Sequence, residues 1–153
     1  MAKHFIEHII DEDRTSGLNP SSLRFRFPPE PNGYLHIGHV KAICLNFDLG
    51  KTYNAPVNLR FDDTNPAKEE QHFVDAIKDD IAWLGYSWDK ECYASDYFDQ
   101  LYNWAIQLIK EGHAYVDAQK PEEIATQKGT PTSPGSASPY RNQDPKEALR
   151  LFE

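Results

Sequence analysis

The stretch Phe27-Pro-Pro-Glu-Pro-Asn-Gly-Tyr-Leu-His-Ile-Gly-His39 joins a predicted strand to a predicted helix, and it decides the fold class. Before it, residues 23–27 alternate apolar and polar side chains, which is typical of a half-buried strand. The prolines and Gly33 then form a stiff turn that cannot continue a helix. From Ile37 onward the apolar residues recur at helical spacing. We therefore predict a strand, a rigid turn and a helix in direct succession.

The rest of the chain continues this alternation of strand and helix patterns. Residues 57–61 alternate as a second strand, so residues 23–61 have the length of a strand–helix–strand crossover. The order of elements predicts an α/β fold with a parallel sheet and flanking helices. Further helices are expected at residues 4–16, 65–85, 95–112 and from Pro121, and a short strand at residues 114–116.

A change in composition marks a candidate domain boundary. Ten of the twelve residues in 129–140 are Gly, Pro, Ser or Thr, which indicates a loop or linker. After it, Asp144-Pro-Lys-Glu147 is a capping box that starts a helix. No stop signal closes this last helix, which suggests a truncated chain. We therefore expect one domain over residues 1–128 and a linker with the beginning of another segment over 129–153.

The composition favours a globular protein over a disordered or membrane protein. Hydrophobic residues are 39% and charged residues 26% of the 153 positions. No apolar run approaches the ~20 residues of a membrane-spanning helix, and residues 1–11 lack the continuous apolar stretch of a signal peptide. Cys44 and Cys92 have no close Cys or His at metal-ligand spacing, so we expect reduced thiols, no metal site and a cytoplasmic location.

The net charge of −8 limits contact with nucleic acid, because a nucleic-acid-binding protein is expected to be basic. Residues 1–60 carry seven Lys and Arg against six Asp and Glu, whereas residues 61–153 carry nine against eighteen. This distribution argues against a large phosphate-binding surface. Any contact with RNA would use a local patch, or a basic surface outside this chain.

Physical chemistry makes the start of the predicted helix at Ile37 a candidate ligand site. Ligands of open α/β sheets bind at the carboxyl ends of strands, and a helix start offers free N–H groups to phosphate. His36 and His39 are three residues apart and point the same way, while Gly38 leaves its backbone accessible. Taken alone, the two histidines also fit ordinary surface residues or metal ligands. Likewise, residues 62–64 after the second strand fit either helix capping or ligand contact.

The full strings resemble one protein family. His-Ile-Gly-His after a strand and a proline-rich turn is the signature of class I aminoacyl-tRNA synthetases, and the whole stretch 28–39 resembles the glutaminyl and glutamyl branch. Asn58-Leu-Arg-Phe-Asp-Asp-Thr-Asn-Pro66 resembles the same branch at the expected distance, and Asn32 favours its glutaminyl members. The resemblance extends to residues 138–141. It implies that residues 1–128 are the first half of a Rossmann-like nucleotide-binding fold and that residues 129–153 begin the acceptor-stem insertion.

The resemblance also implies an activity and a set of site residues. The family activates an amino acid, here glutamine, with ATP and Mg²⁺ and transfers it to tRNA; it needs no prosthetic group, and no membrane partner is expected. His36 and His39 would be catalytic, and ATP would be bound by residues at the turn and the helix start. The implied ATP contacts are Glu30, Pro31, Asn32, Gly33, His36, Gly38 and His39, and the implied amino-acid contacts are Arg26, Asp62 and Thr64.

Three alternatives stay open. One is a glutamyl enzyme of the archaeal or eukaryotic type, and another is a non-catalytic relative that keeps the fold. A nucleotidyltransferase with the same paired histidines is disfavoured by the block at residues 62–66. The second class I signature, Lys-Met-Ser-Lys-Ser, does not occur in the chain. We therefore expect that this chain alone does not charge tRNA.

Overall fold

The structure is a computed structural model that describes residues 3–153, and it divides the chain into two compact units. The first unit runs to Tyr97 and the second comprises Phe98–Glu153. This division falls well before the boundary predicted after residue 128, because the helix that starts at Phe98 belongs with the later elements. Assignment of residues 129–153 to an acceptor-stem insertion remains a prediction.

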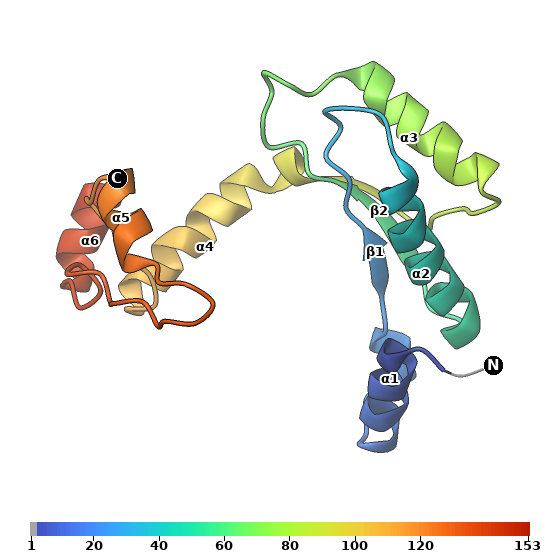
Figure 1. The fold of residues 1–153 in the computed structure, drawn as a ribbon, viewed down its shortest axis with the longest axis horizontal. Helices are drawn as coiled ribbons and strands as arrows, with labels where there is room; N and C mark the ends of the chain where they lie inside the picture. Colours follow the sequence, from blue (N-terminus) through green and yellow to red (C-terminus); the bar gives the residue numbers. More distant parts are fainter. Residues whose placement is uncertain (1–2) are drawn as a thin grey trace. The chain divides into compact units, whose positions relative to one another are not determined.

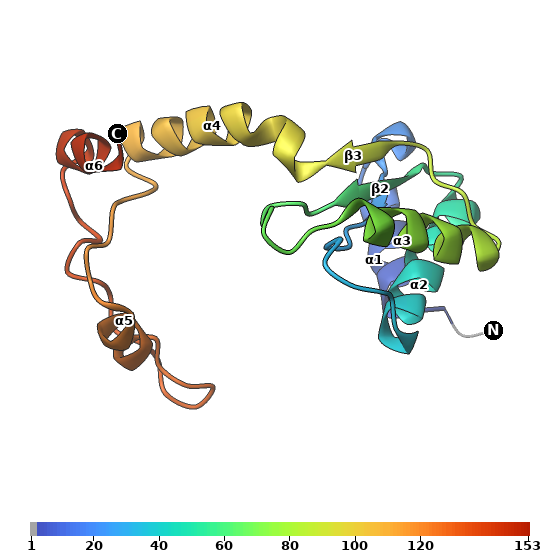
Figure 2. The same ribbon diagram turned by 90° about the horizontal axis from the view of Figure 1, so that it is seen from above.

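A three-stranded parallel sheet forms the centre of the first unit (Figure 1). The strands are β1 (Phe25–Phe27), β2 (Val57–Phe61) and β3 (Glu91–Tyr93), in that order across the sheet. Figure 2 shows β3 lying beside β2, where Leu59 aligns with Glu91. The predicted α/β class and the parallel crossover from β1 to β2 are thereby confirmed.

One predicted strand is wrong, and one observed strand was not predicted. Residues 114–116 form no strand, because the chain there folds back on the preceding helix: the backbone N–H groups of His113 and Ala114 both bond to the carbonyl of Leu108. The missed strand β3 is only three residues long and begins with a charged residue. Its pairing with β2, a contact distant in sequence, makes it a strand.

The helices largely follow the predicted spacing. The elements are α1 (Phe5–Thr15), the 3-10 turn η1 (Pro20–Ser22), α2 (Ile37–Tyr53), α3 (Gln71–Trp83), the 3-10 turn η2 (Ala94–Tyr97), α4 (Phe98–Lys110), α5 (Pro121–Gln127) and α6 (Pro145–Phe152). None of the described helices is long and apolar enough to cross a bilayer.

Two predicted helix starts are wrong. The Asn65 side chain accepts a hydrogen bond from the backbone N–H of Ala67 and closes a single turn, so α3 begins only at Gln71. Ser95 lies inside η2 rather than capping α4, which begins at Phe98. In both places a polar side chain forms a local or tertiary hydrogen bond in place of the predicted cap.

Helices α2 and α3 cover one face of the sheet. Alternate residues of β2 are buried against them, and the intervening Asn58 and Arg60 lie on the opposite face, half-buried. Gly50 of α2 approaches the start of β2 so closely that a Cβ there would lie 2.4 Å from Val57. The buried cluster comprises Phe27, Ile43, Phe47, Val57, Leu59, Phe61, Val74, Ile77 and Ile81.

A small polar cluster joins α3 to β3. Lys78 Nζ lies 2.9 Å from a carboxylate oxygen of Glu91, and the Tyr93 hydroxyl donates a hydrogen bond of 2.7 Å to the same group. Burial alone raises the pKa of Glu91, but the hydrogen bonds from Lys78 and Tyr93 outweigh this effect and lower the pKa below its ordinary value. The ionised carboxylate therefore stabilises the folded state.

We expect this cluster to make stability fall in acid. A carboxyl group with a lowered folded-state pKa contributes stability above its unfolded pKa and loses it as pH falls through the folded value. Lys78→Met should therefore cost about 0.5–1 kcal/mol of unfolding free energy at pH 7 and less at pH 3. Urea unfolding of both proteins at the two pH values measures this, with Lys68→Met, on the exposed loop before α3, as control. An equal cost at both pH values would contradict the prediction.

The second unit is built on α4 and α6. Ile109 and Ala148 are buried there, and the rings of Tyr102 and Phe152 stack at a centroid distance of 5.5 Å.

The predicted loop after residue 128 is confirmed: a single bridge joins Thr130 and Ser133, and Gly129 has a φ of +75°. The Asp144 side chain caps α6 as its sequence predicts.

Candidate functional site

The proline-rich turn after β1 is fixed by the chain segment that follows β2. Pro31 is fully buried. The carbonyl of Pro29 accepts a hydrogen bond from the backbone N–H of Asp62 at 2.9 Å, and the carbonyl of Pro31 accepts one from Glu70 at 3.2 Å. The two sequence blocks singled out above therefore meet at the carboxyl ends of β1 and β2, where ligands of open α/β sheets bind.

His36 and His39 cap the start of α2 reciprocally. Nδ1 of His36 accepts a hydrogen bond from the N–H of Gly38, and Nδ1 of His39 accepts one from the N–H of His36, each at 3.0 Å. Their ring centroids are 4.0 Å apart. Because Nδ1 is the acceptor in both rings, a neutral imidazole carries its proton on Nε2. Each ring thus offers an Nε2–H donor beyond the positive end of a helix.

Gly38 makes room for this arrangement. A Cβ at position 38 would lie 2.7 Å from Cε1 of His36, so any other residue would displace the imidazole. The space beside Gly38, whose backbone we expected to be accessible, is thus occupied in part by the ring of His36. Gly33 differs, because nothing lies within 4 Å of a Cβ placed there, and the turn is open at that point.

A cavity of about 320 Å³ lies against the turn. Glu30 and Asn32 line it and are joined by a hydrogen bond of 2.6 Å from the Asn32 amide to the Glu30 carboxylate. His39 also lines it, whereas His36 lines a separate hollow of about 220 Å³ between α2 and α3. The complete lining is Phe27, Pro28, Pro29, Glu30, Asn32, Gly33, Tyr34, Leu35 and His39.

The three expected amino-acid contacts do not line this cavity. Asp62 reaches the turn through its backbone, and its half-buried carboxylate forms an ion pair with Arg60. Arg26 is exposed on β1 and aligns with Asn58, on the same face of the sheet as Arg60. Thr64 is exposed. The structure thus brings together the turn, the paired histidines and the backbone of Asp62, whereas the side chains of Arg26 and Thr64 are exposed and lie outside the lining of this cavity.

The sequence patterns did not single out two side chains at the carboxyl end of β2, those of Arg60 and Asp63. Arg60 precedes Asp62 by two residues, so strand alternation could have put both on one side of the chain. Asp63 accepts hydrogen bonds from the backbone N–H and the hydroxyl of Ser95. No local signal pairs Asp63 with Ser95, since the contact depends on how β3 lies beside β2.

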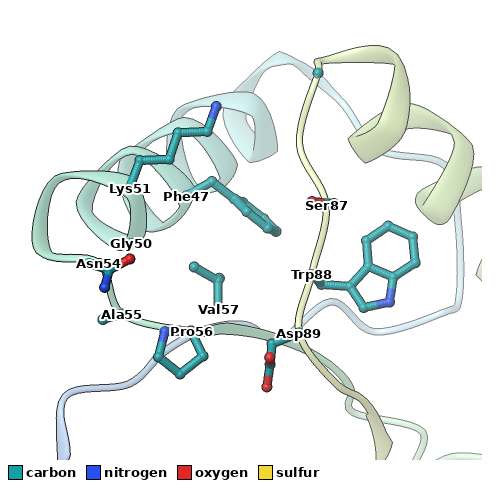
Figure 3. A pocket seen from close by; sticks show the side chains of 11 residues that line it. Phe47, Gly50, Lys51, Asn54, Ala55, Pro56, Val57, Ser87, Trp88 and Asp89 are labelled. Atoms are coloured by element: carbon teal, nitrogen blue, oxygen red, sulfur yellow. The ribbon is translucent and has the colours of Figure 1, made fainter. Parts of the chain in front are cut away.

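A larger cavity than the one at the turn lies elsewhere. It has about 460 Å³ and surrounds the start of β2, with Phe47 and Val57 on its floor and Lys51 at its rim (Figure 3). This is the amino end of the strand, opposite to the end at which ligands of such sheets bind. We assign it no role. Among residues 3–153, no group of three or more His, Cys, Asp and Glu side chains is arranged to hold a metal ion.

Comparison with known proteins adds independent findings. Residues 22–153 match the family described as tRNA synthetases class I (E and Q), catalytic domain. Over 151 residues, or 98% of this chain, the identity is 55% to the glutamine–tRNA ligase of Vibrio vulnificus and 58% to that of Pasteurella multocida. The chain spans 27% of the length of each of these relatives.

Solved structures show a similar fold. A glutamate–tRNA ligase from Elizabethkingia meningosepticum, crystallised in complex with its amino acid, superimposes with a TM-score of 0.58 at 24% identity. The match covers 67% of this chain and 22% of that protein. At this level of identity the likeness concerns the fold alone.

Proposed function

Since the chain belongs to the catalytic-domain family of class I tRNA synthetases of the E and Q type, we propose that it forms the ATP- and amino-acid-binding beginning of a glutamine–tRNA ligase. The observation that carries this proposal is the reciprocal capping by His36 and His39 at the end of the proline-rich turn. It leaves two Nε2–H donors beside a helix start, which is an arrangement suited to phosphate.

ATP, accompanied by Mg²⁺ as part of the substrate, is the nucleotide that this site would take. The glutamine carboxylate attacks the α-phosphorus, the bond from that phosphorus to the bridging oxygen of the β-phosphate breaks, and pyrophosphate leaves. Negative charge shifts onto the phosphate oxygens during this step, and the Nε2–H groups of His36 and His39 would stabilise it. Glu30, Asn32 and Gly33 line the adjoining cavity and would hold the rest of the nucleotide.

Glutamine would be held at the ends of β1 and β2. We assign its ammonium group to the carboxylate of Asp62, which the ion pair with Arg60 holds in place. Arg26, exposed on the same face of the sheet as Arg60, would reach the polar parts of the substrate, and Thr64 would contact either ligand.

The second step would use tRNA. The 2′-hydroxyl of the terminal adenosine attacks the acyl carbon of the adenylate, its proton is lost, and AMP leaves. The acidic second half of this chain gives little basic surface, so most of the RNA contact would come from elsewhere in a complete enzyme. Cys44 and Cys92 are both free thiols, in keeping with our proposal of the cytoplasm as compartment.

The test compares two stable adenylate mimics, the sulfamoyl adenosines of glutamine and of glutamate. We expect calorimetry to show binding of the glutaminyl compound at least about tenfold tighter than that of the glutamyl compound, because a site built for an amide rejects a charged analogue. Tighter binding of the glutamyl compound would transfer the proposal to the glutamyl branch. If neither compound binds, the proposed ATP- and amino-acid-binding site is contradicted.

A further inference from the structure

The loop between β2 and α3, residues 62–70, is tied to the first unit at three points. Its two ends bond through backbone N–H groups to the carbonyls of Pro29 and Pro31. The third contact is made by a side chain: the carboxylate of Asp63 accepts a hydrogen bond of 2.9 Å from the backbone N–H of Ser95 and another from the Ser95 hydroxyl. Ser95 lies in η2, directly after β3, so this contact crosses from the end of one strand to the end of the next.

The two successive carboxylates of this loop have different partners. Asp62 pairs with Arg60 of β2, the strand that directly precedes the loop, whereas both carboxylate oxygens of Asp63 accept hydrogen bonds from Ser95. Adjacent carboxylates repel one another, and here each of the two has a separate donor partner. Neither Asp63 nor Ser95 lines the cavity at the turn.

We propose that Asp63 is a positioning residue: by bonding to Ser95 it fixes the loop so that the neighbouring carboxylate of Asp62 faces the ammonium group of the amino acid. The inference rests on the proposed function, which assigns that ammonium group to Asp62. A carboxylate accepting two hydrogen bonds from one residue fixes both its position and its rotation. A loop that is already ordered loses less freedom when the ligand binds.

The experiment uses two probes, glutaminyl-sulfamoyl adenosine and the same compound without its α-amino group. In Asp63→Ala, calorimetry should show about tenfold weaker binding of the first probe and less than about twofold weaker binding of the second, because the effect passes through Asp62 to the amino group. The affinity of Ser95→Ala for the first probe should lie between that of Asp63→Ala and that of the parent chain. Ser95→Thr keeps the hydroxyl and should therefore bind the first probe as the parent chain does. Asp79→Ala, which removes an exposed carboxylate from α3, is the matched control.

If Asp63 had a merely structural role, Asp63→Ala would bind both probes equally more weakly, and that result would overturn the inference. A loss of affinity for the first probe no larger than that of Asp79→Ala would overturn it as well. Amide hydrogen exchange of residues 62–70, measured without ligand, separates the inference from the proposed function. Binding of neither probe by the parent chain would count against the proposed function alone. Faster exchange in Asp63→Ala would in that case still support the part of the inference that has Asp63 fix the loop, and unchanged exchange would overturn it.

Discussion

The double variant His36→Ala, His39→Ala is expected to bind glutaminyl-sulfamoyl adenosine at least about 100-fold more weakly than the parent chain. Each imidazole offers one Nε2–H donor to the phosphate-like group, and a hydrogen bond to a charged partner contributes about 1.5–3 kcal/mol. In a complete enzyme the same change would lower the rate of adenylate formation by a comparable or larger factor, since one such donor can stabilise a transition state by about 3 kcal/mol. Calorimetry measures the affinity and pyrophosphate exchange the rate.

A loss of helix capping must be separated from a loss of ligand contact. The double variant removes both caps of α2 and should lower stability by about 1–3 kcal/mol, since each cap contributes roughly 0.5–2 kcal/mol. The single variant His36→Asn keeps the imidazole of His39 and places a capping side chain at position 36, so it should recover much of the stability but only part of the affinity. His8→Ala, at an exposed position of α1, is the control for removal of a histidine. Unchanged affinity in the double variant would contradict the assigned role of the pair.

Local patterns predicted the parts of this site that depend on neighbours in sequence. The turn, the start of α2 and the strand before it follow from prolines, glycine and apolar spacing within the stretch 27–39. The mutual capping of His36 and His39 uses their spacing of three residues, and the structure places their rings together. Here local propensity and tertiary structure agree, so the predicted strand, turn and helix start, and the shared direction of the two rings, are confirmed.

The predictions that failed depend on contacts between segments distant in the chain. Strand β3 exists because three residues align with β2, and α3 starts late because Asn65 closes its own turn and Glu70 bonds to Pro31. The partner of Asp63 is 32 positions away. Sequence spacing carries no information on such pairings, and only the register of the sheet brings these groups together.

The end of β2 should also control stability, and Phe61→Ala is expected to have the largest effect on it. The ring of Phe61 is fully buried, lies in the cluster between the sheet and its two helices, and stacks on Tyr93 at 5.2 Å. Removing a buried phenylalanine costs about 3–5 kcal/mol through lost burial and the cavity left behind. Because Phe61 directly precedes Asp62, the same change should loosen the hydrogen bond from Asp62 to Pro29 and with it the turn.

Urea unfolding followed by circular dichroism measures this cost, and Phe98→Ala is the control, since Phe98 is 46% exposed. The control should change the unfolding free energy by less than about 1 kcal/mol, in keeping with exposed positions. If Phe61→Ala leaves too little folded protein, Phe61→Leu keeps most of the volume and should cost roughly 1 kcal/mol. A cost for Phe61→Ala equal to that of the control would mean that the sheet is not held together by this cluster. The carboxyl ends of β1 and β2 would then need another source of rigidity to hold a nucleotide.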